Sequence, residues 1–167
     1  DRHGLVWVNL GIESAAGELL ETCGGKPKMA GVAADRWAEF TAEQLRRLCA
    51  LGYLPLASLV LGLPGETPAH VERTRAWVRG LRDLRLTIYP LLYAPVDGTA
   101  TPPRQRFTKQ HWQLVRECYE LNFRHMPGLY WDNQGRGGIS LAKRWLFQIL
   151  GRGQVAQWRS LLALRQW

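Results

Sequence analysis

The stretch Ser58-Leu-Val-Leu-Gly-Leu-Pro-Gly-Glu66 decides the fold. A short apolar run without alternation is typical of a strand that is buried on both faces of a parallel sheet. Pro64 cannot donate to a sheet ladder, and the glycines on either side of it accept unusual backbone angles, so the strand must end here. Thr67 and Pro68 then supply a helix N-cap and a first helical residue. The stretch therefore predicts a strand, a turn and a helix, with the turn where α/β proteins bind ligands.

Two other apolar runs predict further strands. Residues 5–12 are followed by Glu13 and Ser14, and residues 86–93 contain Pro90, which requires an edge position, a bulge or a backbone free of ladder bonds. Helices are expected over residues 16–23, 41–50 and 68–82. This alternation of strands and helices predicts an α/β fold with a parallel sheet.

The carboxyl ends of parallel strands lie on one side of a sheet, so the residues that follow the three strands should converge on one site. Glu13 and Ser14 offer a carboxylate and a hydroxyl, which suit ribose hydroxyls. The bare backbone at Gly62 lets a flat ring lie against the chain, and the third strand would bring Tyr89 to Tyr93 and the loop Pro95–Thr99 to the same site. Taken alone, the glycine turn is equally well explained as a tight connection without a ligand.

Charge divides the chain into two parts. Residues 1–103 hold 11 Lys/Arg and 11 Asp/Glu, whereas residues 104–167 hold 11 Lys/Arg and 3 Asp/Glu, so the second part carries the whole net charge of +8. Five of the eight tryptophans also lie in the second part. We therefore expect an α/β unit over residues 1–103 and a basic, Trp-rich helical extension over residues 104–167.

The extension is expected to contain three helices. One runs from Thr108 to about residue 124, a glycine-rich irregular segment follows over 125–138, and two amphipathic helices span 141–150 and 155–164, separated by Gly151-Arg-Gly153. Three roles remain open for these last helices: packing on the sheet, docking on a membrane surface through 141–167, and binding single-stranded nucleic acid.

The cysteines and the lengths of the apolar runs indicate the cellular compartment, and the first residues indicate whether the sequence is a piece of a longer protein. Cys23, Cys49 and Cys118 are odd in number and far apart, which favours buried thiols in a reducing, cytoplasmic compartment over a disulfide framework. No apolar run is long enough to span a membrane. The sequence opens on Asp1 and leads directly into an apolar run, so we expect it to be a piece of a longer protein.

Three segments together carry a resemblance. Val8-Asn-Leu-Gly-Ile-Glu-Ser14, Leu59-Val-Leu-Gly-Leu-Pro-Gly-Glu-Thr67 and Pro95-Val-Asp-Gly-Thr99 resemble the latter half of radical S-adenosylmethionine (radical SAM) enzymes, in the branch that also binds cobalamin. The resemblance implies the C-terminal part of a partial (β/α)6 TIM-like barrel. It also implies an enzyme that uses a 4Fe-4S cluster to cleave S-adenosylmethionine to a 5′-deoxyadenosyl radical, acting on a small-molecule substrate that the sequence does not identify.

The same resemblance implies roles for particular residues. Glu13 and Ser14 would hold the ribose or amino-acid portion of the cofactor, and the backbone of the third strand would meet the edge of the adenine. The residues implied around the adenine are Val60, Gly62, Leu63, Pro64, Tyr89, Leu91 and Leu92. Two features depart from the family pattern: Ala15-Ala16 replaces a Gly-Ser pair, and Glu66 lies one position late.

The cluster motif CxxxCxxC of this family is absent, as is a cobalamin-binding motif. The cluster ligands and any cobalamin domain would lie outside this chain, which is therefore expected to be inactive by itself. The four histidines lack metal-ligand spacing and are expected at the surface or in hydrogen bonds. Two other interpretations are an iron-free nucleotide-binding barrel enzyme and a non-enzymatic α/β module whose basic tail binds a membrane surface or nucleic acid.

Overall fold

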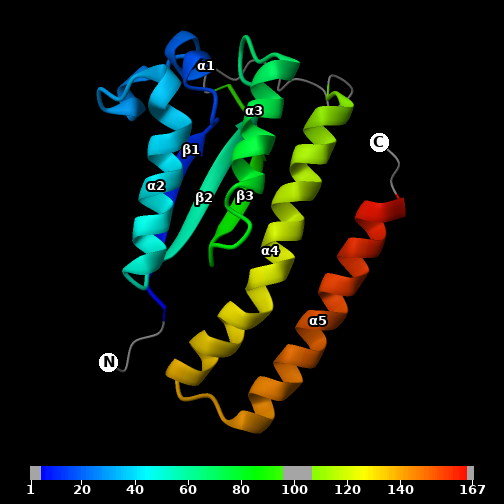
Figure 1. Ribbon diagram of the computed structural model, residues 1–167. Coiled ribbons are helices and arrows are strands. Elements are labelled where there is room, and N and C mark those ends of the chain that lie inside the picture. Colours follow the sequence, from blue (N-terminus) through cyan, green and yellow to red (C-terminus); the bar gives the residue numbers. More distant parts are fainter. Residues whose placement is uncertain (1–4, 96–106, 165–167) are drawn as a thin grey trace.

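The computed structural model describes residues 5–95 and 107–164 (Figure 1). Its strands β1 (Trp7–Glu13), β2 (Leu54–Leu61) and β3 (Thr87–Leu92) form a parallel sheet in the order β1-β2-β3. The predicted α/β fold with a parallel sheet is confirmed. Each strand lies beside the next one along the chain, so within the described residues the sheet is built in one direction.

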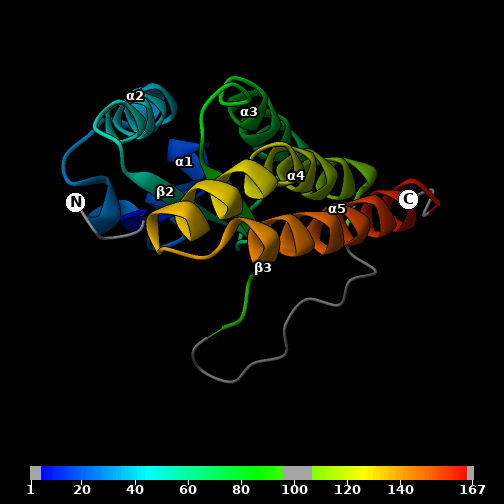
Figure 2. The same cartoon turned by 90° about the horizontal axis from the view of Figure 1, so that it is seen from below.

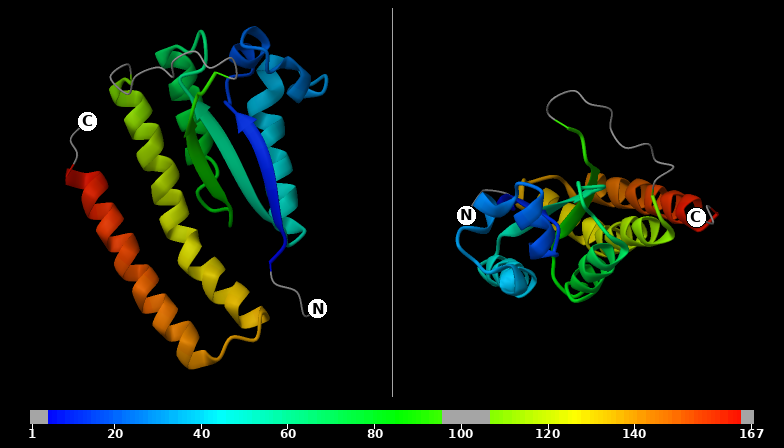
Figure 3. Two further views of the ribbon diagram at one scale, coloured as in Figure 1. Left: turned by 180° about the vertical axis from the view of Figure 1, so that it is seen from behind. Right: turned by 90° about the horizontal axis from the view of Figure 1, so that it is seen from above.

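The helices are α1 (Gly17–Thr22), α2 (Trp37–Ala50), α3 (Pro68–Arg79), α4 (Lys109–Arg136) and α5 (Leu141–Leu164), with short 3-10 turns η1 (Lys26–Met29) and η2 (Ala34–Arg36). Helices α2 and α3 lie in front of the sheet in Figure 1 and behind it in the opposite view of Figure 3, and α4 runs beside them along the β3 edge. Figure 2, seen from below, shows α2 and α3 together on one side of the strands and α5 beyond α4. Right-handed crossovers between strands added in one direction place the connecting helices on one face.

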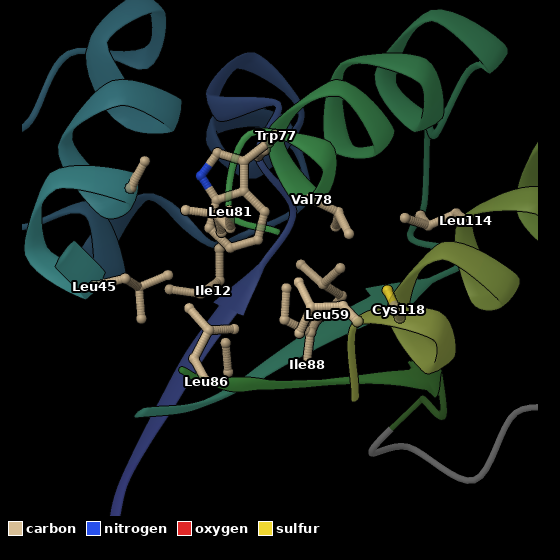
Figure 4. Packing of buried hydrophobic residues seen from close by; sticks show 14 of the residues in the cluster. Ile12, Leu45, Leu59, Trp77, Val78, Leu81, Leu86, Ile88, Leu114 and Cys118 are labelled. Atoms are coloured by element: carbon tan, nitrogen blue, oxygen red, sulfur yellow. The ribbon is translucent and has the colours of Figure 1, made fainter. Parts of the chain in front are cut away.

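The core lies between the sheet and these helices. Ile12, Leu59 and Ile88 come from the three strands, and each is at most 6% exposed. They meet Val78 of α3 and Cys118 of α4, among other side chains (Figure 4). Burial of an Ile or Leu of this kind contributes about 1.5–3 kcal/mol to the free energy of unfolding. The apolar stripes of the helices and the alternate residues of the strands therefore fix the layers.

The expectation that the central strand is buried on both faces is wrong. Along β2, Ala57, Leu59 and Leu61 are buried, whereas Leu56, Ser58 and Val60 are half-buried. This alternation is typical of a sheet with one covered face. The sequence is apolar on both faces of β2, but in the described residues the helices cover only one of them.

Two helix predictions in the extension are also wrong. The segment expected to be irregular continues α4 to Arg136, although Pro127 lies inside the helix, and α5 is one helix that passes through Gly151 and Gly153. Glycine in a helix interior costs only about 1 kcal/mol relative to alanine. Packing offsets such costs, since α4 and α5 contact each other, Leu129 of α4 is buried and Gly151 of α5 is half-buried.

The other boundaries follow the sequence more closely. The predicted cap of α3 is present: the Thr67 side chain accepts the His70 N–H at 3.4 Å. Helix α2 begins at Trp37, four residues before the expected cap at Thr41, whose hydroxyl instead donates to the Trp37 carbonyl at 2.9 Å. No helix among the described residues is long and apolar enough to cross a membrane.

One side chain of α4 forms hydrogen bonds with the backbone at the free edge of β3. The Asn122 Oδ1 accepts the Ile88 N–H at 2.8 Å, and the Asn122 amide group donates to the Ile88 carbonyl at 2.8 Å. These are the two bonds that a neighbouring strand would make. Pro90, two residues farther along, has no N–H to offer on the same edge. Of the alternatives that the sequence left open for Pro90, the structure shows the edge position, since β3 pairs only with β2 in the described part of the chain.

We predict that Asn122→Leu lowers the free energy of unfolding by about 2–4 kcal/mol, because it leaves two buried backbone groups of Ile88 without partners. Urea denaturation monitored by circular dichroism measures the change. Asn133→Leu is the matched control, since the Asn133 side chain accepts one bond, from the Leu5 N–H at 2.9 Å, at a half-buried position of the same helix. If Asn122→Leu lowers the free energy of unfolding no more than the control does, the proposal that Asn122 takes the place of a neighbouring strand is contradicted.

Candidate functional site

A cavity of about 340 Å³ lies at the carboxyl end of β2. The turn Gly62–Glu66 forms one wall, and Tyr93, Phe107 and His111 complete the lining. The Tyr93 N–H donates to the Leu61 carbonyl at 2.9 Å, so the pairing of β2 with β3 brings Tyr93 beside the turn. The sequence-predicted residues Gly62, Leu63 and Pro64 thus line a cavity at the edge of the sheet where α/β proteins bind ligands.

The turn is closed by its own carboxylate. Gly62 and Gly65 have φ angles of +82° and +79°, which side chains other than glycine rarely adopt. The Glu66 Oε2 accepts the Gly62 N–H at 2.8 Å, and the Glu66 N–H donates to the Leu63 carbonyl at 3.0 Å. Glu66 is therefore part of the turn geometry itself, and the Gly62 N–H is engaged within the turn.

His111 joins α4 to this turn. Its Nδ1 accepts the Thr108 N–H at 3.1 Å, which places the proton on Nε2, and Nε2 donates to the Glu66 Oε2 at 2.8 Å. The side chains of Glu66 and His111 are 7% and 10% exposed. A largely desolvated hydrogen bond between an imidazole and a carboxylate is stronger than one at the surface. The pair therefore fixes the start of α4 against the end of β2.

Phe107 lies over both parts of the site. Its ring stacks on the His111 ring with 4.8 Å between centroids and 15° between planes. Its Cε1 lies 3.5 Å from the position that a Cβ on Gly62 would take. The cavity thus combines aromatic faces, bare backbone and one carboxylate, which are the groups that hold flat, hydrogen-bonding ligands.

Glu13 ends β1, the strand next to β2, and is not among the residues that line the cavity. It pairs in register with Leu59 across a bulge, and its φ of +62° is rare for a residue with a side chain. Its carboxylate forms an ion pair with Lys28 and is 17% exposed. A strained backbone and a partly exposed carboxylate at a strand end are typical of binding sites.

Ser14 is held inside the protein. Ser14 is 2% exposed. The Ser14 hydroxyl lies 3.2 Å from the Thr74 hydroxyl and accepts the Ala16 N–H at 3.1 Å. The Ser14 carbonyl accepts the Trp37 Nε1–H at 2.9 Å. These bonds fix the corner after β1 against α2 and α3, and a ligand would have to displace them to reach the Ser14 hydroxyl.

The remaining predicted residues follow the strands. Val60 pairs with Leu91 and lies half-buried on the face of the sheet that α2, α3 and α4 leave uncovered. Leu91 and Leu92 are about half exposed. Tyr89 lines a different cavity, beside α4 and α5. Of the predicted loop Pro95–Thr99, residues 96–99 lie outside the described residues.

The described residues contain no cluster of His, Cys, Asp or Glu that could hold a metal ion. Cys118 is fully buried in the main core, and desolvation raises the pKa of its thiol far above the usual range. Partial burial also raises the pKa of the Cys49 thiol, against a smaller lowering by Arg85. The predicted buried character is confirmed for Cys118, while Cys23 and Cys49 are half-buried.

Sequence reasoning missed the Glu66–His111 pair. The sequence predicted only that His111 lies at the surface or in a hydrogen bond, and the hydrogen-bonded role is confirmed. The spacing of Thr108 and His111 gives a local cap, but nothing local indicates a partner 45 residues earlier. No protein-family model and no curated protein matches the sequence.

We predict that Glu66 and His111 are energetically coupled. Glu66→Ala leaves the Gly62 and His111 N–H groups without their shared acceptor, so we expect a loss of about 2–4 kcal/mol in the free energy of unfolding. In a double-mutant cycle with His111→Phe, urea denaturation should give a coupling of about 1–3 kcal/mol. Glu72→Ala removes an exposed carboxylate and serves as the control. Additive losses at Glu66 and His111 would contradict the coupling.

Proposed function

We propose that this chain supplies the S-adenosylmethionine side of a radical SAM active site, as the C-terminal part of a partial (β/α)6 TIM-like barrel. The observation that carries the proposal is the cavity at the carboxyl end of β2. It joins the glycine turn of the resembling motif to Phe107, Tyr93 and the Glu66–His111 pair. Its volume of about 340 Å³ lies within the range of small-molecule sites, roughly 300–1,000 Å³.

The winding of the sheet supports this proposal. A sheet built in one direction with its helices on one face is the arrangement of a barrel segment, whose uncovered face lines the interior. At the edge of β3, Asn122 bonds the backbone groups of Ile88 and Pro90 has no N–H to donate. The strand β1, in contrast, pairs in the described residues with β2 alone. Further strands of a barrel would therefore continue from β1, on the N-terminal side.

The residues of this chain fit the adenosine part of the cofactor. Phe107 and Tyr93 offer faces to a purine, the α-carbon of Gly62 leaves room beside it, and the Glu13 carboxylate would accept ribose hydroxyl groups. Nothing in the sequence offers the three cysteines of the cluster motif. The 4Fe-4S ligands, and cobalamin if it is used, belong outside these residues in this proposal, and no radical step is derived for this chain.

We predict that S-adenosylhomocysteine binds the chain weakly through its adenosine protons, as measured by saturation-transfer NMR. Gly62→Ala should weaken the signal at least fivefold, since the new methyl group faces Phe107 in the cavity. Gly52→Ala is the matched control: Gly52 has a φ of +84° and open space around it, so both variants carry the same backbone strain of about 1 kcal/mol. Absence of a signal, or equal signals from the two variants, would argue against the adenosine site.

A second candidate function is docking on an anionic membrane surface through α5, which would give a cytoplasmic protein a peripheral membrane association. The half-buried residues of α5 recur at 144, 148, 151, 155 and 162, and so mark the stripe toward α4. Leu146 and Ile149 lie on the opposite side, 55% and 65% exposed. A surface helix normally presents polar residues there.

The positive charge of α5 indicates that its outward face binds an anionic partner. Residues 141–164 contain four lysine or arginine residues, Lys143, Arg144, Arg152 and Arg159, and no aspartate or glutamate. Arg144 and Arg159 are engaged by Trp131 and Glu120, so Lys143 and Arg152 would face lipid headgroups. Apolar side chains flanked by cations are typical of helices that lie in a lipid interface. Single-stranded nucleic acid is the competing partner for such a basic, aromatic surface.

We predict that the chain co-sediments with phosphatidylglycerol vesicles and that Leu146→Gln/Ile149→Gln reduces binding about tenfold or more, because two apolar side chains no longer enter the interface. Leu51→Gln/Tyr53→Gln alters two comparably exposed apolar residues near the end of α2 and should bind like the unaltered chain. Binding to oligo(dT) but not to vesicles would overturn membrane docking in favour of nucleic acid. Equal vesicle binding by both double variants would remove the role of α5.

A further inference from the structure

A second, larger cavity of about 700 Å³ lies between β3, α4 and α5. Aromatic side chains dominate its lining: Tyr89 of β3, Tyr119, Phe123 and Tyr130 of α4, and Phe147 and Trp158 of α5. The Tyr119 and Phe123 rings contact each other with 5.8 Å between centroids. The cavity is distinct from the one at the carboxyl end of β2, because the two share no lining residue.

Among the described residues, none that lines this cavity is charged, although 22% of the chain is Asp, Glu, Lys or Arg. Two of its polar side chains are already bonded within the protein. Asn122 bonds both backbone groups of Ile88, and the Gln148 amide donates to the Pro127 carbonyl at 3.3 Å. An ionised ligand would lose its hydration without gaining a charged partner, which is costly. The chemistry of the lining therefore favours an uncharged, largely apolar ligand.

The shape of the cavity favours a chain over a compact ring. Its lining on α5 extends from Phe147 to Trp158, eleven residue steps of a helix, or about 16 Å. Gly151 lies in the middle of this span, and a Cβ there would meet nothing within 4 Å. Glycine thus leaves open space at the point where α5 passes α4. A space of this length with mostly apolar walls matches an extended aliphatic chain.

We propose that this cavity binds a neutral lipid with a single long aliphatic chain, of the class of fatty alcohols. The inference does not rest on the adenosine site, since it uses a separate cavity and separate residues. It also differs from docking on a membrane surface, because the ligand enters between α4 and α5, whereas Leu146 and Ile149 face away from this contact.

The test is binding of the fluorescent apolar probe N-phenylnaphthylamine to the full chain, followed by displacement with dodecanol. We expect saturable binding that dodecanol displaces and dodecanoate, its carboxylate counterpart, displaces at least tenfold less well. Gly151→Leu should reduce probe affinity at least tenfold, because the new side chain fills open space in the cavity. Gly153→Leu is the matched control, since Gly153 lies on the same helix in equally open space but outside the lining.

Both leucine variants replace a helical glycine and should retain or raise the helical circular dichroism, so a loss of binding in one of them is not a loss of folding. Leu146→Gln/Ile149→Gln should bind the probe normally. Three outcomes would overturn the proposal: no saturable binding to the unaltered chain, equal binding by Gly151→Leu and Gly153→Leu, and equal displacement by dodecanol and dodecanoate.

Discussion

The structure depends on one topological constraint: three parallel strands are laid side by side in the order in which they occur. Right-handed connections between such strands bring the helices to the same face. That face becomes the core, in which Leu59 and Ile88 meet α3 and α4, while Val60 and its neighbours on the other face remain half-buried. The two sheet edges must then be treated separately, because each exposes backbone groups that seek partners.

Helix α4 supplies partners for backbone groups at the β3 edge, and it also contributes a residue to the cavity at the end of β2. Near its middle, Asn122 substitutes for a missing strand along Ile88. At its start, His111 holds the carboxylate that closes the turn after β2. The two contacts lie eleven residues apart on one rigid helix, so the end of the sheet and the cavity at that end are positioned by the same element. A change in the packing of α4 would therefore alter the site as well as the fold.

The sequence predicted those features that local chemistry determines. The strand, glycine turn and capped helix around Gly62 were predictable because backbone freedom, a missing N–H and an N-cap are properties of neighbouring residues. The partners of Asn122 and His111 were not, since they are 34 and 45 residues away in the chain and only packing brings them together. Continuous helices through Pro127 and Gly151 were missed for the same reason: their local cost is real, but tertiary contacts exceed it.

The two cavities lie along one strand but differ in chemistry. Tyr89 lines the uncharged cavity and Tyr93 the one with the Glu66–His111 pair, and four residues of a strand span about 13 Å. Successive residues of a strand face opposite sides, so Tyr89 and Tyr93, which follows directly after β3, belong to the same side. A ligand bound between α4 and α5 would thus lie beside the sheet face that carries Val60 and leads to the glycine turn. The extension is then more than a cover for the sheet edge, because it adds an apolar compartment next to a polar one.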